Sequence, residues 1–149
     1  MLQYQTGQLL NPTETNINEK VKYTANTGTA ALSTANPNLD GTGTIATVIT
    51  AASNGTLLKT CTIKALGNTT RGIVRFFIGD GGGFTRIIDE VDIPAIIQSS
   101  KQEAFSISYD MDWCLKAGYT IGASTEKAEN FAITIEGLDY SYPTSLNGL

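Results

Sequence analysis

The chain has 149 residues, a mass of 15.8 kDa and a net charge of −4, with no histidine and two cysteines. A chain of this length normally forms one domain and buries enough surface to fold without cross-links. Without histidine, neither a Ser-His-Asp or Cys-His apparatus nor a His-ligated metal site can be built. Ten Lys or Arg against fourteen Asp or Glu, scattered along the chain, lack the basic patch of a nucleic-acid binder. We therefore expect a protein that is not an enzyme and carries no cofactor or metal.

The composition favours β-structure. Thr, Asn, Gly and Ile are abundant, whereas charged residues make up only 16% of the chain. Thr and Ile are β-branched and suit a pleated surface, and Gly and Asn supply the positive φ angles that turns require. The sequence thus predicts an all-β protein with a neutral polar surface that is suited to contacts with other proteins or sugars.

Residues 1–43 differ from the rest of the chain. They are dominated by Thr, Asn, Gln, Ala and Gly, and their periodicity is poor apart from a short predicted strand over residues 20–24. A segment of this kind cannot form a core alone and becomes ordered only against something else, which in a structural protein is usually a neighbouring subunit. We expect an extended arm or tether over residues 1–43 and a β-sandwich domain over residues 44–149. The arm's isolated apolar residues are candidate partner contacts: Leu9, Leu10, Ile17 and Val21.

From residue 44 onward the chain reads as seven short strands separated by Gly and Asn turns. No helix of normal length interrupts them, although one helical turn is expected within residues 95–101. This spacing is typical of an antiparallel β-sandwich, and a further strand near Val21 would give the eight strands of a jelly roll. In the fifth of these predicted strands, Phe105, Ile107, Tyr109 and Met111 alternate with polar residues and are expected to face inward. The seven predicted strands cover residues 44–51, 57–66, 72–78, 84–93, 103–111, 119–124 and 131–136.

The chain opens with neither a basic segment nor a long apolar run, so we expect no secretory signal and no membrane span. Cys61 and Cys114 could form a disulfide in a secreted protein. Cys61, however, alternates with apolar neighbours in a predicted strand, and free cysteine behaves as a small core residue. The sequence therefore favours two reduced, buried thiols over a disulfide.

The glycine-rich segment 79–83 lies between two predicted strands. A phosphate-binding loop needs a helix after it, and none is predicted here. The segment is interpreted as a flexible hairpin, and its exposed tip, formed by Asp80, Gly81 and Gly82, is a candidate partner contact.

Two carboxylate groups, Asp110 with Asp112 and the acidic run 89–92, could suggest catalysis or calcium binding. Neither has the oxygen density of a calcium loop or the evident cleft of a glycosidase. Asp112 is instead expected to cap a short segment over residues 113–116 that ends at Gly118.

Aromatic side chains near the C-terminus allow two interpretations. Trp113, Tyr119, Tyr140 and Tyr142 could form a platform on which sugar rings stack. The favoured alternative places Tyr119 in the core and leaves Trp113 to seal one end of the sandwich with its indole N–H at the rim. Trp113 is retained as a candidate partner contact in either case.

The stretch 113–125 (WCLKAGYTIGAST) and the stretch 131–140 (FAITIEGLDY) resemble the ending of a class of bacteriophage virion proteins. The predicted hairpin over residues 72–93 is similar to the upstream strand pair of the same proteins. The resemblance covers about residues 44–142. It implies a non-enzymatic β-sandwich associated with the capsid or tail, and it transfers no catalytic residue.

Two hypotheses follow. The leading one is a virion structural protein, acting as a capsid decoration or auxiliary component or as a connector or tail component. It would be assembled in the host cytoplasm, would form homo-oligomers, and would bind other virion proteins through its arm and sandwich surface without binding nucleic acid or membrane. The alternative is a carbohydrate- or receptor-binding module that recognises a host glycan through Trp113, the tyrosines and the loop 79–83.

Overall fold

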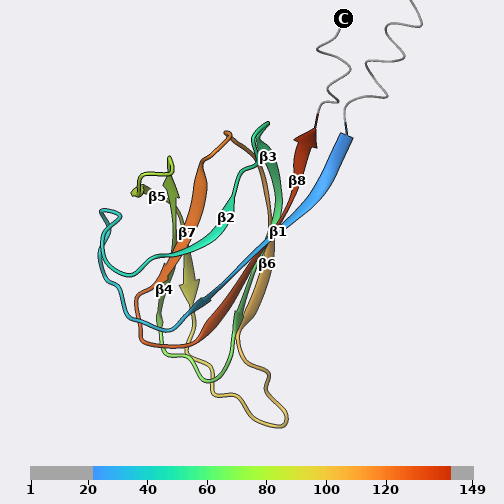
Figure 1. Cartoon of the computed structure of the whole chain (residues 1–149). Helices are drawn as coiled ribbons and strands as arrows, with labels where there is room; N and C mark the ends of the chain where they lie inside the picture. Colours follow the sequence, from blue (N-terminus) through green and yellow to red (C-terminus); the bar gives the residue numbers. More distant parts are fainter. Residues whose placement is uncertain (1–21, 142–149) are drawn as a thin grey trace, which may run out of the picture.

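In a computed structural model of the chain, residues 22–141 can be described, and they form eight β-strands (Figure 1). In these residues no helix is long and apolar enough to cross a membrane. The strands are β1 (Lys22–Leu32), β2 (Ala46–Thr50), β3 (Thr56–Ala65), β4 (Gly72–Gly79), β5 (Phe84–Ile93), β6 (Ser106–Leu115), β7 (Thr120–Thr125) and β8 (Phe131–Ser141).

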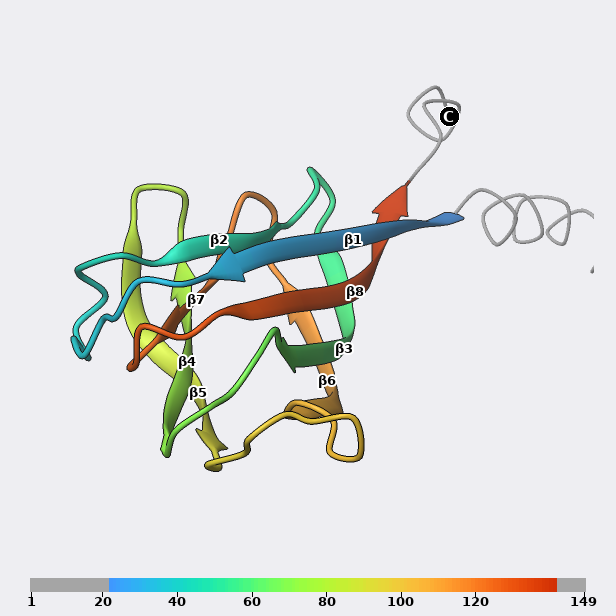
Figure 2. The same ribbon diagram turned by 90° about the horizontal axis from the view of Figure 1, so that it is seen from below.

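The strands form two antiparallel four-stranded sheets that pack face to face. One has the order β1-β8-β3-β6 and the other the order β2-β7-β4-β5. Only the connection from β4 to β5 stays within one sheet, and every other connection crosses to the opposite sheet (Figures 1 and 2). This is the eight-stranded double-sheet arrangement of a jelly roll. The predicted all-β sandwich is confirmed, and the strand order, which the sequence left open, is now defined.

The core lies between the sheets and is built from alternate residues of each strand. Phe131, Ile133 and Ile135 of β8 are buried as the alternation predicts, and they meet Val74 and Phe76 of β4 from the opposite sheet. Successive side chains of a strand point to opposite faces, so each strand contributes every second residue to this layer.

The predicted arm is corrected for the residues that the structure describes. β1 pairs with β8 along its whole length, from Lys22↔Ser141 to Leu32↔Phe131, and is therefore part of the sandwich. Its opposite edge lies beside β2, as Figures 1 and 2 both show. The predicted boundary at residue 43 is thus wrong for residues 22–43. The reason is physical: β1 is an edge strand of small Thr, Ala and Gly residues, most of them exposed, and it carries little hydrophobic periodicity.

The connection from β1 to β2 is organised by a buried asparagine. Asn36 is 2% exposed, and its Nδ2 donates to the carbonyl oxygens of Thr42 at 3.0 Å and Thr44 at 2.9 Å. Its Oδ1 accepts a hydrogen bond from the Asn38 N–H at 3.0 Å, and its own N–H donates to the Thr125 carbonyl at 2.8 Å. One side chain therefore supplies the hydrogen bonds that this loop cannot make in a sheet.

Two local predictions fail near β6. Residues 95–101 form an irregular connection with isolated bridges instead of a helical turn. Residues 113–115 continue β6, and Asp112, with φ of 53°, lies at an irregularity in the β3–β6 pairing and caps no helix. A bulge places an extra residue in an unusual backbone conformation while the strand continues beyond it.

Candidate interaction surfaces

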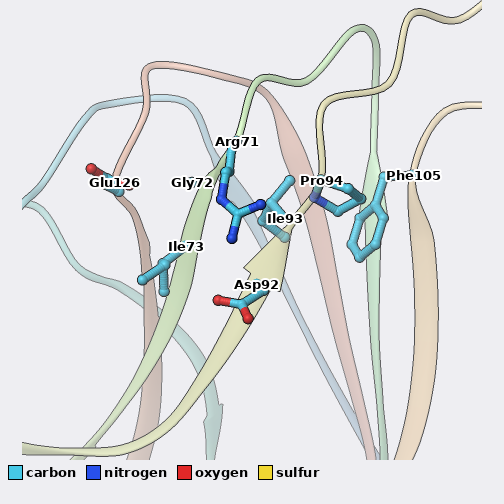
Figure 3. Close-up of a pocket in the computed structure, with 8 residues that line it drawn as sticks. All are labelled: Arg71, Gly72, Ile73, Asp92, Ile93, Pro94, Phe105 and Glu126. Atoms are coloured by element: carbon cyan, nitrogen blue, oxygen red, sulfur yellow. The ribbon is translucent and has the colours of Figure 1, made fainter.

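A concavity of about 710 Å³ lies at one end of the sandwich (Figure 3). Its apolar wall combines the end of β5 with Phe105, which precedes β6. Its charged groups are Arg71, Asp92 and Glu126, and Figure 3 shows the Arg71 guanidinium between the strand ends with the Asp92 carboxylate below it. The full lining is Arg71, Gly72, Ile73, Asp92, Ile93, Pro94, Phe105 and Glu126.

The loops around this concavity are tied together by hydrogen bonds. The backbone of Thr69 exchanges two hydrogen bonds with Ile96, and its Oγ1 donates to the Pro94 carbonyl at 2.7 Å. The Glu129 carboxylate accepts hydrogen bonds from the N–H and the Oγ1 of Thr70. A mixed apolar and charged hollow with fixed walls is suited to holding a side chain of a partner protein. In residues 22–141 no three Cys, Asp or Glu residues lie close enough together to hold a metal ion.

A second concavity, of about 220 Å³, opens on the side of the sandwich where β5 and β6 form the sheet edges. It is lined by Ile88 and Asp89 of β5 and by Tyr109, Asp110, Met111 and Trp113 of β6. The Tyr109 hydroxyl donates to Asp89 Oδ2 at 2.9 Å and so joins the two sheets across this side. As predicted, Phe105, Ile107, Tyr109 and Met111 share the inward face, because Ile107 and Tyr109 pair with the fully buried Ile63 and Cys61. Ile107 nevertheless remains 37% exposed because this side is open.

The two cysteines are free, but only one of them is buried as the sequence predicted. Cys61 is buried in the core, whereas Cys114 is exposed on β6. Burial raises the pKa of the Cys61 thiol to about 11, and burial beside Cys61 and Asp89 raises the pKa of Tyr109 well above its ordinary value. The prediction of reduced thiols agrees with the structure, and the prediction that both are buried is wrong for Cys114.

We expect one thiol of the folded protein to react with a thiol reagent at pH 8 and two to react after denaturation. Cys114 is accessible, whereas Cys61 is buried and almost entirely protonated at that pH, and the thiolate is the reactive form. Cys114→Ser should abolish the fast reaction, and Cys61→Ser should leave it unchanged. Rapid modification of both thiols in the native protein would contradict this assignment.

The glycine-rich hairpin forms the turn between β4 and β5, as predicted. Asp80, Gly81 and Gly82 are exposed, and the Gly82 N–H donates to Asp80 Oδ1 at 3.0 Å. Gly81 and Gly83 adopt positive φ angles of 97° and 137°, which explains the run of glycines. The tip stands apart from the concavity that Trp113 lines, so the structure does not bring these two candidate contacts into one site.

The aromatic platform is divided in the structure. Trp113 is 37% exposed on the open side, whereas Tyr119 packs against the core with the Lys116 ammonium 5.6 Å from its ring centre. Tyr140 packs edge-on against Tyr23 with ring centres 5.4 Å apart. Tyr142 and the predicted contacts Leu9, Leu10, Ile17 and Val21 lie outside the described residues.

The sequence did not point to the concavity at the sandwich end or to Asn36 as the organiser of a loop. The concavity forms only when four segments far apart in the sequence meet. Asn36 belongs to the stretch 36–41 (NPNLDG), which indicates a turn but does not reveal which side chain is buried.

The strand order and the inter-sheet connections define an all-β jelly-roll protein. No protein-family model matches the chain, and no curated protein matches it significantly. Among solved structures, it is similar to a chain of the acid-stable capsid of the Helicobacter pylori bacteriophage KHP30, with a TM-score of 0.51 and 8% identity over 79% of this chain and 92% of that chain. It also matches Eiger TNF from S. frugiperda, with a TM-score of 0.49 and 8% identity over 81% and 94% of the two chains. A third match is a chain of the cyanophage Pam1 capsid, with a TM-score of 0.39 and 13% identity over 83% and 87%.

At 8% identity, the similarity to the KHP30 capsid chain establishes a common fold and does not establish a common function. At the level of fold, the resemblance to bacteriophage virion proteins is confirmed. The matched region includes nearly the whole of that capsid chain, so the likeness extends across the sandwich and is not confined to one hairpin.

Proposed function

We propose that this chain is a structural protein of a bacteriophage virion that binds other virion proteins. The observation that carries the proposal is the two-sheet strand order, shared in overall fold with a phage capsid chain of which it covers 92%. Viral capsid domains are among the proteins that use the jelly roll. The location is then the virion, after assembly in the host cytoplasm, and the role is that of a capsid, decoration, connector or tail component without enzymatic activity.

Exposed apolar side chains support a role in protein contacts. Leu66 and Ile97 are 60% and 76% exposed in the loops at the sandwich end that carries the 710 Å³ concavity, and Leu39 is 59% exposed in the loop between β1 and β2. Large apolar side chains grouped near a hollow with a polar rim are typical of protein-binding surfaces. The body and the segment 1–21, with Leu9, Leu10 and Ile17, are the parts proposed to attach to the particle.

The attachment test is a deletion of residues 1–21, which leaves β1 intact, whereas deletion through residue 43 would remove a strand of the sandwich. We expect the truncated protein to remain folded and to lose at least about 90% of its occupancy on purified particles, since an arm contributes through effective concentration. Occupancy is measured by quantitative mass spectrometry of virions. Undiminished occupancy would rule out the arm as a tether, and absence of the full-length chain from virions would overturn the proposed function.

The carbohydrate-binding alternative rests on Trp113, which lines the 220 Å³ concavity together with Tyr109 and the carboxylate-bearing Asp89. Aromatic rings and carboxylates are suitable groups for holding a sugar. A glycan array separates the two functions. Specific glycan binding that disappears in Trp113→Ala, with the fold intact, would favour the carbohydrate-binding module over the virion component.

A further inference from the structure

Strand β6 lies at the edge of its sheet and carries unpaired backbone groups. The Phe105 carbonyl accepts a hydrogen bond from the Ala65 N–H at 2.8 Å, so the backbone of Phe105 faces β3. In an antiparallel ladder, the hydrogen-bonding direction alternates from residue to residue. The N–H and C=O groups of Ser106, Ser108 and Asp110 therefore point away from β3, toward an edge at which no other strand of residues 22–141 pairs.

The other sheet edges are better protected against pairing. β5 carries the charged residues Asp89, Glu90 and Asp92 and two register irregularities, both of which discourage the addition of a strand. β2 has only five residues, and β1 lies beside it on the side of the sandwich opposite to β5 and β6, which we call the closed side. β6 has ten residues and is regular from Ser106 to Asp110, so it presents the longest available edge.

The apolar side chains of β6 also lack complete cover. Ile107 and Trp113 face the open side and are each 37% exposed. A long edge strand with partly exposed apolar residues is a template for another strand.

We propose that β6 pairs with β6 of a second copy of this chain, antiparallel, around a two-fold axis at Tyr109. This register places Ser108 of each copy opposite Asp110 of the other on the outer face, so a hydroxyl donor meets a carboxylate twice. On the inner face it places Ile107 opposite Met111. Ser108 and Asp110 are the residues whose free backbone groups face the edge, so they exchange the hydrogen bonds of the new ladder.

The partner that fits the β6 edge is a second copy of β6, because its hydrogen-bonding and charged side chains complement those of the first. A two-fold contact is isologous, so the same strand must complement itself. In a register centred on Asp110, that carboxylate would meet its own copy, and like charges directly opposite each other destabilise a strand pair. The register centred on Tyr109 avoids that repulsion and joins two four-stranded sheets into one.

The test is the mass of the full chain by sedimentation equilibrium between about 1 and about 100 µM, a range that detects a dimer of ordinary affinity. We expect a species of twice 15.8 kDa. Ser108→Asp places two carboxylates opposite each other at both ends of the contact and should raise the dimer dissociation constant at least about tenfold. The variant should still fold, because Ser108 is exposed and an aspartate can accept the hydrogen bond that Thr62 Oγ1 can donate there.

Thr29→Asp is the matched control. Thr29 stands in the same row of the same sheet, through Thr134 and Thr62 to Ser108, but at the opposite edge, and the variant gains the same charge. It should form dimers like the wild type. The double variant Ser108→Asp/Asp110→Ser exchanges donor and acceptor at unchanged composition and should regain the dimer.

Three outcomes would overturn the proposal: a wild-type mass that stays at 15.8 kDa, equal dissociation of Ser108→Asp and Thr29→Asp, or a double variant that stays dissociated. The dimer does not depend on the proposed virion role. If the protein forms the dimer in solution but is absent from virions, the β6 contact is supported and only the proposed virion function is contradicted.

Discussion

Replacing Gly28 with alanine is expected to destabilise the entire sandwich by about 3 kcal/mol, as overpacking of a close contact does. Gly28 lies in β1 where this strand passes beside β2. An added Cβ would collide with the Val48 carbonyl oxygen and would lie 2.6 Å from Ile49 Cβ. Backbone and Cβ atoms cannot swing away as a long side chain can, so β1 and β2 would have to separate.

Chemical denaturation monitored by circular dichroism and by Trp113 fluorescence measures this effect, since Trp113 is the only tryptophan of the chain. The control is Thr29→Ala, which is exposed on the outer face and should change the free energy of unfolding by about 0.5 kcal/mol or less. Equal stability of Gly28→Ala and the wild type would mean that residues 22–32 contribute little to the sandwich. That result would restore the extended arm predicted from composition.

The elements that the sequence predicted well are those with an uninterrupted alternation of large and polar residues. β8 is the clearest example, because Phe131, Ile133 and Ile135 fall on one face and become the centre of the core. β1 was largely missed, because an edge strand needs few large residues and its Thr and Ala side chains carry no such pattern. β6 was predicted to end near residue 111, since a bulge at Asp112 interrupts its alternation.

The candidate surfaces were less predictable because they depend on which segments meet. Asp80–Gly82 was recognised from local turn chemistry, and local chemistry was sufficient to place it at an exposed tip. Trp113 was recognised as a rim aromatic, but its partners Ile88 and Asp89 come from a strand about 25 residues away in the chain. The strand order that brings β5 and β6 to the same side is a property of the whole jelly roll, and no motif within either strand encodes it.

That order also explains why the two sides of the molecule differ. On one side β1 and β2 lie together and the closely fitting Gly28 closes the seam. On the other side a hydrogen bond between the Tyr109 hydroxyl and the Asp89 carboxylate links the two sheets, and apolar residues of β6 remain partly exposed. The closed side depends on the close fit of β1 and β2, and the open side is the one at which we propose association.

Asn36→Asp is expected to lower the free energy of unfolding at pH 7 by about 3 kcal/mol, because a buried polar site loses its donor and gains a charge. The Asn36 amide nitrogen donates to two carbonyl oxygens, those of Thr42 and Thr44, and a carboxylate oxygen in its place would face both without a hydrogen. The substitution preserves the size of the side chain, so the change isolates the hydrogen bonds. Asn38→Asp, at an exposed position in the same loop, is the matched control and should have little effect.

The same variant should show a pH dependence of defined sign. Burial and the two facing carbonyls would raise the pKa of the new carboxyl in the folded state above its value of about 3.9 in the unfolded chain. The folded state then binds the proton more tightly, so the stability lost at pH 7 is recovered as the pH falls from the folded-state pKa toward the unfolded one. Denaturation curves of the variant and of Asn38→Asp between about pH 7 and about pH 4 measure the difference. A gap between the two variants that stays constant or widens toward acid pH would show that the Asn36 amide does not hold this loop together.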